Sequence, residues 1–212
     1  MSLSIFRPYS FIPKLTIEAC ALDILLQMQK THNYLPKFPL DASRVAEFLG
    51  LDVVWDTISD DEYGAIAARI LPLEKLIEIN DRIPQLQGGL GESTIAHEIG
   101  HWVLHIDRTE VERQIRLKHR GLAIKVEPLL CRSLESTEGV EWQAQYFAGC
   151  LLMPQYYLLQ LSQAKNLAKW QHLYQIAEQL GVTISNLVHR LQDLGWIYCD
   201  SQQKEIYLLK NH

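Results

Sequence analysis

The pattern of hydrophobic and polar positions predicts an α+β protein with helices on both sides of a short β-region. Apolar residues at helical spacing predict helices over 15–31, 43–50, 109–121, 140–152 and 183–195, and another ending near 181. Runs rich in β-branched residues predict strands over 51–57, 64–71 and 76–80, the last two as a hairpin around Pro72. Residues 196–209 predict a second hairpin at the C-terminal end.

A glycine-rich stretch separates this β-region from a strongly apolar helix. Residues 81–92 contain three glycines and Pro84, so they predict a loop. Ser93 or Thr94 is then the expected N-cap of the helix that follows.

That helix carries the most informative chemistry of the chain, in the stretch TIAHEIGHWVLH at residues 94–105. His97 and His101 stand four apart, on one helix face and about 6 Å apart along its axis, so both imidazoles can bind one ion. Glu98 is rotated by about 100° and is better placed to act as a general base on a water molecule than to bind the ion. An ordinary amphipathic helix is the alternative, but the flanking residues are apolar, and buried histidines need partners.

A catalytic zinc site takes three protein ligands and leaves one position open. Glu141 is the favoured third ligand because it opens the helix at 140–152 and is followed on the same face by Ala144 and Ala148. Small side chains at those two positions let this helix lie close beside the histidine helix. The carboxylate can then reach the ion.

Two other residues near the histidine motif, His105 and Asp107, could also supply the third ligand. His105 is rejected because it lies about 12 Å from His97 along an unbroken helix. Asp107 stands six residues after His101 and stays an alternative, although Leu104 occupies the place where such a site needs a glycine to turn the chain.

Composition and charge narrow the class of protein. The chain has 212 residues, 48% hydrophobic and 21% charged, as expected for one globular domain with a sizeable core, or for one domain plus a small appendage. The net charge of −5 argues against broad nucleic-acid binding, and no apolar run reaches membrane-spanning length. The N-terminus does not have the pattern of a signal peptide, and the four cysteines are far apart, so we expect reduced thiols and a cytoplasmic location.

The sequence resembles the ImmA/IrrE family of metallo-endopeptidases. The similarity rests on TIAHEIGHWVLH at 94–105 and EWQAQYFAGCLLMP at 141–154, with weaker similarity from about 14 to 197. By position, the resemblance implies zinc ligands His97, His101 and Glu141, with Glu98 as the base. The chain departs from the family pattern at Gln145, where asparagine is usual, at residues 92–94, and in a longer segment between the two motifs.

The expected fold is a zincin-like mini-fold. A small mixed or antiparallel sheet should pack on the two motif helices within residues 1–160, and residues 161–212 should form a helix-turn-helix-like subdomain with a hairpin. The strand at 76–80 is expected to line the cleft and pair with an extended substrate, which makes Ile79 and Asn80 candidate substrate-binding residues. Tyr146 is a further candidate, as a group that stabilises the oxyanion.

The expected function is that of a zinc-dependent endopeptidase that makes limited cuts in a partner protein. The family resemblance implies that this partner is a separate XRE-type helix-turn-helix repressor. Two alternatives stay open: a metal-stabilised module that only sequesters a repressor, and a DNA-binding regulator that uses residues 175–191. Direct DNA binding is not expected, because the second helix of that segment offers only His189 and Arg190 to phosphates, with Asp193 nearby.

Overall fold

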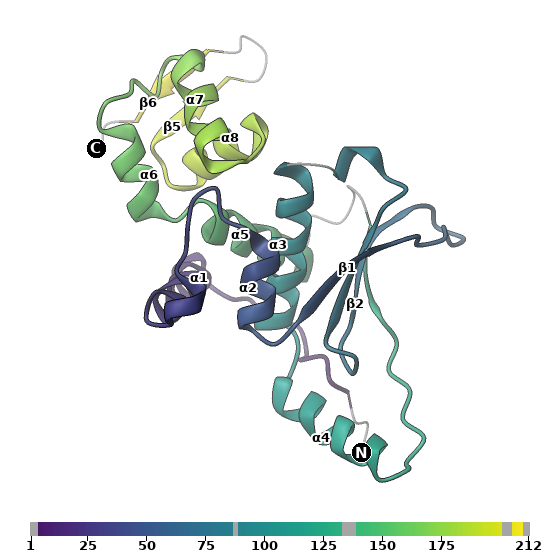
Figure 1. The fold of residues 1–212 in the computed structure, drawn as a ribbon. Coiled ribbons are helices and arrows are strands. Elements are labelled where there is room, and N and C mark those ends of the chain that lie inside the picture. Colours follow the sequence, from purple (N-terminus) through teal and green to yellow (C-terminus); the bar gives the residue numbers. More distant parts are fainter. Residues whose placement is uncertain (1–3, 87–88, 133–138, 201–204, 210–212) are drawn as a thin grey trace.

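The computed structural model describes residues 4–86, 89–132, 139–200 and 205–209, and it has the predicted α+β class (Figure 1). The helices are α1 (Lys14–Gln29), α2 (Ala42–Phe48), α3 (Gly89–Leu104), α4 (Arg108–His119), α5 (Val140–Leu152), α6 (Gln155–Ser162), α7 (Trp170–Leu180) and α8 (Ile184–Asp193). The strands are β1 (Asp52–Asp56), β2 (Ile66–Leu71), β3 (Leu76–Asn80), β4 (Leu129–Arg132), β5 (Ile197–Cys199) and β6 (Ile206–Leu208). The hydrophobic pattern did not predict β4 and α6. Both elements are short, each directly follows a proline, and neither stretch has a clear period.

The first four strands form one mixed sheet in the order β1-β3-β2-β4. β2 and β3 form the predicted antiparallel hairpin, β4 runs antiparallel to β2, and β1 runs parallel to β3. β3 therefore has a hydrogen-bonded strand on each side. The prediction that residues 76–80 pair with a substrate along a free edge is wrong, because β1 covers that edge.

The burial of β3 also removes two of the candidate substrate-binding residues. Ile79 is 0% exposed and Asn80 is 1% exposed. The Asn80 amide nitrogen donates to the carbonyl oxygens of Ile58 at 3.0 Å and Ile66 at 2.8 Å. Asn80 therefore ties the connection between β1 and β2 to the sheet, and neither residue presents a surface to a peptide.

Helix α3 begins earlier than the glycines suggest, at Gly89. The hydroxyls of Ser93 and Thr94 donate to the carbonyls of Gly89 and Leu90, each at 3.0 Å, so both residues lie inside the helix and neither caps it. A Cβ atom on Gly89 would lie 2.5 Å from the carbonyl oxygen of Gly181. Gly89 therefore permits a close contact between the start of α3 and the segment at Gly181. A glycine-rich composition alone does not show whether such glycines form a loop or allow a close contact within a helix.

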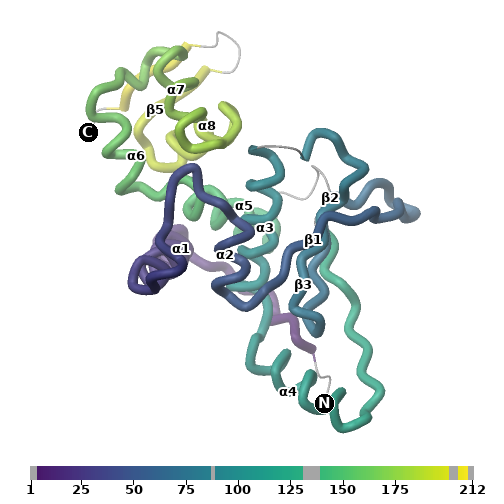
Figure 2. The backbone as a smooth tube through the Cα atoms, in the orientation of Figure 1, coloured from purple at the N-terminus to yellow at the C-terminus, as the bar shows by residue number. Residues whose placement is uncertain are grey.

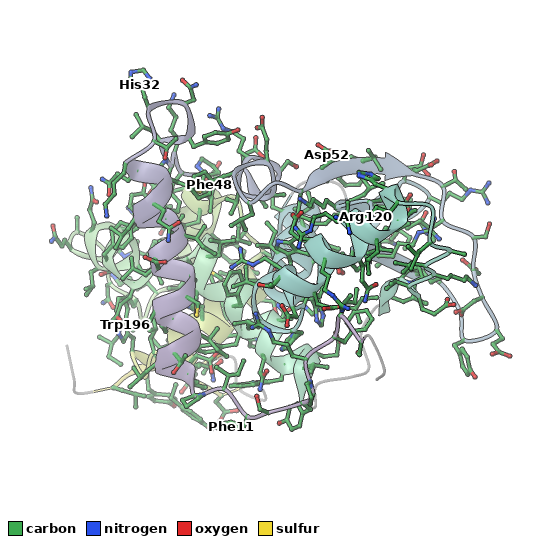
Figure 3. The ribbon with its side chains drawn as sticks, turned by 90° about the horizontal axis from the view of Figure 1, so that it is seen from below. Phe11, His32, Phe48, Asp52, Arg120 and Trp196 are labelled. Atoms are coloured by element: carbon green, nitrogen blue, oxygen red, sulfur yellow. The ribbon has the colours of Figure 1, made fainter. Side chains whose placement is uncertain are left out.

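The sheet, α3, α5 and α1 follow one another across the molecule (Figures 1 and 2). α3 packs on β2 and β3 with one side and on α5 with the other, and α5 in turn packs on α1. Figure 3 shows α1, between the labelled Phe11 and His32, along one side of the molecule, with Asp52 and Arg120 toward the other. The sheet therefore packs on the histidine helix α3, as predicted, whereas α5 packs on the other side of α3.

The C-terminal elements gather beside the N-terminal end of α3 (Figure 1). Thr183 caps α8 by accepting a hydrogen bond from the Asn186 backbone at 3.2 Å. The Asn186 side chain then donates to the Ser93 hydroxyl of α3 at 2.8 Å, and Lys14 of α1 pairs with Asp193 at 2.7 Å. These contacts hold α8 against the helices that carry the motifs. The predicted domain boundary at residue 160 stays a prediction.

Candidate metal centre and active site

Two histidines of α3 and one glutamate of α5 converge on one point. The Nε2 atoms of His97 and His101 are 3.0 Å apart, and the Oε2 atom of Glu141 lies 3.1 Å from the first and 3.4 Å from the second. Glu141 follows His101 by 40 positions in the sequence and lies on another helix, yet the three donor atoms lie within 4.8 Å of one another. The structure thus brings together the three residues that the sequence singled out.

These separations suit a tetrahedral metal ion. Ligand atoms bonded at about 2.0–2.2 Å to a tetrahedral zinc ion lie about 3.3–3.5 Å from one another. The three separations found here are within about 0.5 Å of that range, so small side-chain rotations would complete the geometry. The His97–His101–Glu141 group could therefore bind a metal ion.

Close packing of α3 and α5 brings Glu141 to this point. A Cβ atom added to Gly100 would lie 2.9 Å from the carbonyl oxygen of Ala144 and 3.0 Å from its Cα atom. Gly100 lies between the two histidines, and Ala144 lies almost one turn after Glu141. The small residue predicted on α5 thus has a matching small residue on α3, which the sequence reasoning did not identify.

The alternative third ligand has a different role. The Asp107 carboxylate accepts hydrogen bonds from the backbone of Thr109 at 3.0 Å and Glu110 at 3.2 Å, and so it caps α4. Among the described residues, it does not belong to the group that converges on the histidines. Glu141 is therefore the better-placed carboxylate.

His105 is not one of the three converging donors, as predicted, but it contacts one of them. Its Nδ1 atom lies 3.0 Å from Nδ1 of His101, and its Nε2 atom lies 2.9 Å from the side-chain oxygen of Gln143. The Gln143 nitrogen donates to the carbonyl oxygen of Ser10 at 2.9 Å. A chain of polar contacts thus runs from His101 to the N-terminal segment.

The Ser10 carbonyl oxygen determines the direction of the hydrogen bonds between Ser10 and His101. A carbonyl oxygen only accepts, so Gln143 donates to Ser10 with its nitrogen and accepts from His105 with its oxygen. Neutral His105 then carries its proton on Nε2 and accepts at Nδ1 from the Nδ1–H group of His101. The Nε2 lone pair of His101 is thereby directed at the point of convergence.

A similar contact orients His97. Its Nδ1 atom lies 3.3 Å from the side-chain oxygen of Gln145, which accepts the proton and leaves Nε2 facing Glu141. Metal-binding histidines commonly make such a bond with their second nitrogen, which fixes both the tautomer and the ring orientation. The glutamine that departs from the family pattern therefore still supplies the required acceptor.

The electrostatics of the group favour a charged carboxylate. Burial raises the pKa of Glu141, but its close polar contacts with His101 and His97 outweigh burial and hold this pKa well below its ordinary value. Burial lowers the pKa of His101 to about 4, although the bond with Glu141 opposes it. Burial also lowers the pKa of His97, but the Glu141 hydrogen bond and the charges of Glu98 and Glu141 reverse that shift. The charged Glu141 carboxylate therefore faces both imidazoles at the point where a cation would bind.

Glu98 directly follows His97 on α3 and is fully buried, with 0% exposure. Its charge acts on the His97 imidazole and raises the pKa of that ring. Helical geometry turns it away from the direction shared by His97 and His101, in agreement with a role beside the metal ligands rather than among them.

Tyr146 does not point at this group. Its hydroxyl donates to a carboxylate oxygen of Glu18 on α1 at 3.3 Å, and burial raises its pKa well above the ordinary value. It stacks on Trp142, with ring centroids 5.5 Å apart. The suggested role in stabilising an oxyanion is therefore wrong, because the hydroxyl is bound to a different helix.

A comparison with protein families agrees with this geometry. Residues 129–192 match the IrrE N-terminal-like domain of peptidase family M78. The ImmA/IrrE resemblance is confirmed. The match includes Glu141 and Gln145 and begins after the histidine motif, so the two motifs support the same conclusion from different parts of the chain. It supports a metallopeptidase of the IrrE/ImmA type.

The comparison with curated proteins finds no match. Within the described part of the chain, no helix is both long and apolar enough to cross a membrane.

Proposed function

We propose that this protein is a zinc-dependent endopeptidase that makes limited cuts in a partner protein. The observation that carries the proposal is the convergence of His97, His101 and Glu141 within 4.8 Å, with buried Glu98 directly beside the first ligand. Two imidazoles and one carboxylate are an established zinc set in peptidases, with one coordination position left for water or substrate. The family match supports the same chemistry.

Zinc bound at this group would polarise the scissile carbonyl and make a water molecule acidic near neutral pH. The side chains of the protein then handle the protons. Glu98 accepts a proton from the attacking water as the new carbon–oxygen bond forms. The same carboxylic acid delivers that proton to the amine nitrogen as the carbon–nitrogen bond breaks. Glu98 returns to its charged form as it gives this proton to the amine, and the products then leave.

Strand β4, rather than β3, is the surface proposed to bind the peptide backbone. β4 lies at one end of the strand order, with β2 on one side, and the chain leads from it to the helix of Glu141. An extended peptide can add to such an edge through main-chain hydrogen bonds. We propose that the natural substrate is a separate XRE-type repressor, whose cleavage relieves repression in the cytoplasm.

The two alternatives, a module that only sequesters a repressor and a DNA-binding regulator, would each require different structural features. A module that only sequesters a repressor has no use for a buried carboxylate beside the metal ligands. A DNA-binding regulator would need the outer face of α8 for phosphates, yet Arg190 is 2% exposed and Asn186 is bonded to Ser93. Both observations favour the peptidase.

The test compares two kinds of variant. Glu98→Gln keeps the size of the side chain, so zinc content and folding should match wild type while cleavage falls by a factor of roughly 10² or more. His101→Ala and Glu141→Ala should lose metal and activity together. Zinc content is measured by elemental analysis, and cleavage is followed with co-expressed XRE-type repressors and a reporter gene. Normal relief of repression by Glu98→Gln would overturn proteolysis and leave the sequestering module.

A further inference from the structure

A pocket of about 470 Å³ lies between α5 and α8, beside the N-terminal half of α3. One wall is formed by Trp142, Gln145, Tyr146, Gly149 and Leu152 of α5 together with the following Met153, and α8 forms the other wall with Asn186, Arg190 and Asp193. Ser93 closes the end toward α3. None of the proposed catalytic steps uses this space.

The pocket lies next to one of the metal ligands, His97, and Gln145 stands between them. Gln145 lines it, and its side-chain oxygen lies 3.3 Å from Nδ1 of His97. Ser93 precedes His97 by one helical turn and is bonded to Asn186 of the opposite wall. One amide group thus separates the pocket from a metal ligand. A peptide whose scissile bond lies at the metal can place a neighbouring side chain here.

The charged groups that line the pocket are neutralised within the protein. Arg190 pairs with Glu18 of α1 at 2.6 Å and donates to the Met153 carbonyl at 3.2 Å. Asp193 pairs with Lys14 of α1 at 2.7 Å. A charged side chain that entered would compete with these pairs, so the walls favour a neutral occupant.

The wall formed by α5 is largely apolar. Trp142 stacks on Tyr146, and Leu152 and Met153 are each 2% exposed to solvent. Burial of an apolar side chain against such a wall is favourable, because it removes apolar surface from water. Gln145 directs its oxygen at His97, which leaves its amide nitrogen as a donor for a backbone carbonyl at the pocket entrance.

We propose that this pocket is a specificity subsite for one large neutral apolar side chain of the substrate, such as Leu, Met or Phe, next to the scissile bond. Gln145 orients the same peptide by donating to its backbone while it holds His97. The subsite rests on the proposed peptidase function, whose substrate preference it specifies.

Gly149 is the position at which to alter the pocket. Within 4 Å, a Cβ atom there meets only the Arg190 Cδ atom, at 3.7 Å, so a methyl group fits and a longer side chain starts toward the α8 wall. Gly149→Leu should fill the space, whereas Gln160→Leu places the same side chain on an exposed position of α6 as the matched control. Gly149→Ala is the milder variant, to be used if Gly149→Leu does not fold.

The probe is an equimolar library of synthetic decapeptides, cut by the zinc-loaded protein and read by mass spectrometry. Wild type and Gln160→Leu should favour Leu, Met or Phe at one position beside the cut. Gly149→Leu should shift that position toward Ala or Ser by about tenfold or more, as expected when a hydrophobic pocket loses several methylenes of space. Gly149→Ala should disfavour Phe at the same position. Cleavage with an unchanged preference in either glycine variant, with zinc retained, would overturn the subsite and leave the peptidase standing.

A binding arm separates this failure from a failure of the peptidase. Immobilised, zinc-loaded Glu98→Gln should retain library peptides rich in Leu, Met or Phe, and the added Gly149 substitution should abolish that enrichment. If wild type cuts no peptide while this binding pattern is found, the pocket stands as a peptide site and proteolysis falls. If neither cleavage nor enrichment is found, both proposals are overturned.

Discussion

The Nδ1 atom of His105 lies 3.0 Å from the Nδ1 atom of His101, and this contact connects a metal ligand with the N-terminal segment. Gln143 continues the connection to the carbonyl oxygen of Ser10. Because a carbonyl oxygen can only accept, it sets the direction of each hydrogen bond between Ser10 and His101. Burial lowers the pKa of His105 although its bond with Gln143 opposes the shift, so the ring is neutral and can accept at Nδ1. His105 is thus a positioning residue for His101.

Removal of this acceptor should weaken metal binding. His105→Ala leaves the Nδ1–H group of His101 without its acceptor, so the zinc dissociation constant should rise by about 10- to 100-fold. His105→Gln should restore part of the affinity, since its carbonyl oxygen can accept the same bond. Competition titration with a zinc chelator measures both. His119→Ala, on the exposed end of α4, is the matched control. Equal zinc affinity in His105→Ala and wild type would contradict the positioning role.

The contact between Gly100 and Ala144 predicts a second effect on the site. In Gly100→Ala the new Cβ atom would meet the Ala144 backbone at 2.9 Å, so α3 and α5 must separate. Overpacking of this kind costs about 1–3 kcal/mol, although alanine is the better helix former. Urea denaturation of the metal-free protein should show this loss, and zinc affinity should fall because Glu141 moves away with α5.

Gly149→Ala provides the comparison for that experiment. Its Cβ atom has an ordinary contact of 3.7 Å, so the helix propensity of alanine should act alone and stabilise the protein by about 0.5–1 kcal/mol. If Gly100→Ala were as stable as Gly149→Ala, the close approach of the two helices would not be what positions Glu141.

Glu92 predicts a dependence of stability on pH that does not involve the metal ligands. Its carboxylate accepts a hydrogen bond from the Ala42 backbone at 2.7 Å. Burial nevertheless raises its pKa, with a smaller contribution from the charge of Asp41, against the lowering effect of the Ala42 bond. The folded protein therefore holds this proton more tightly than the unfolded chain. The resulting stabilisation is complete below the ordinary pKa and is lost as the pH rises through the raised value.

Glu92→Gln should remove this dependence while keeping an oxygen that accepts from Ala42. Relative to wild type, the free energy of unfolding of the variant should increase as the pH rises from below the ordinary carboxyl pKa through the raised pKa of Glu92. Denaturant titrations of both proteins across that interval measure the difference. A constant difference would show that Glu92 titrates alike in the folded and unfolded states.

The sequence by itself determined the local part of the site. Residues four apart on a helix share a face, so the pairing of His97 with His101 and the separate direction of Glu98 follow from helix geometry alone. Ala144 and Ala148 indicated that the helix of Glu141 could approach closely, and the family resemblance pointed to the same glutamate. These inferences depend on neighbours in the chain, where periodicity is informative.

Only the tertiary structure decided which distant segments meet. The apolar pattern of residues 76–80 suits an edge strand and a central strand alike, and the pairing with β1 placed them inside the sheet. The choice of Glu141 over Asp107 required the close approach of α5 at Gly100, and Asp107 proved to cap α4. The bonds from His101 to Ser10 and the pocket between α5 and α8 each join segments far apart in sequence. Such contacts depend on side-chain directions after packing, and periodicity along one chain does not encode them.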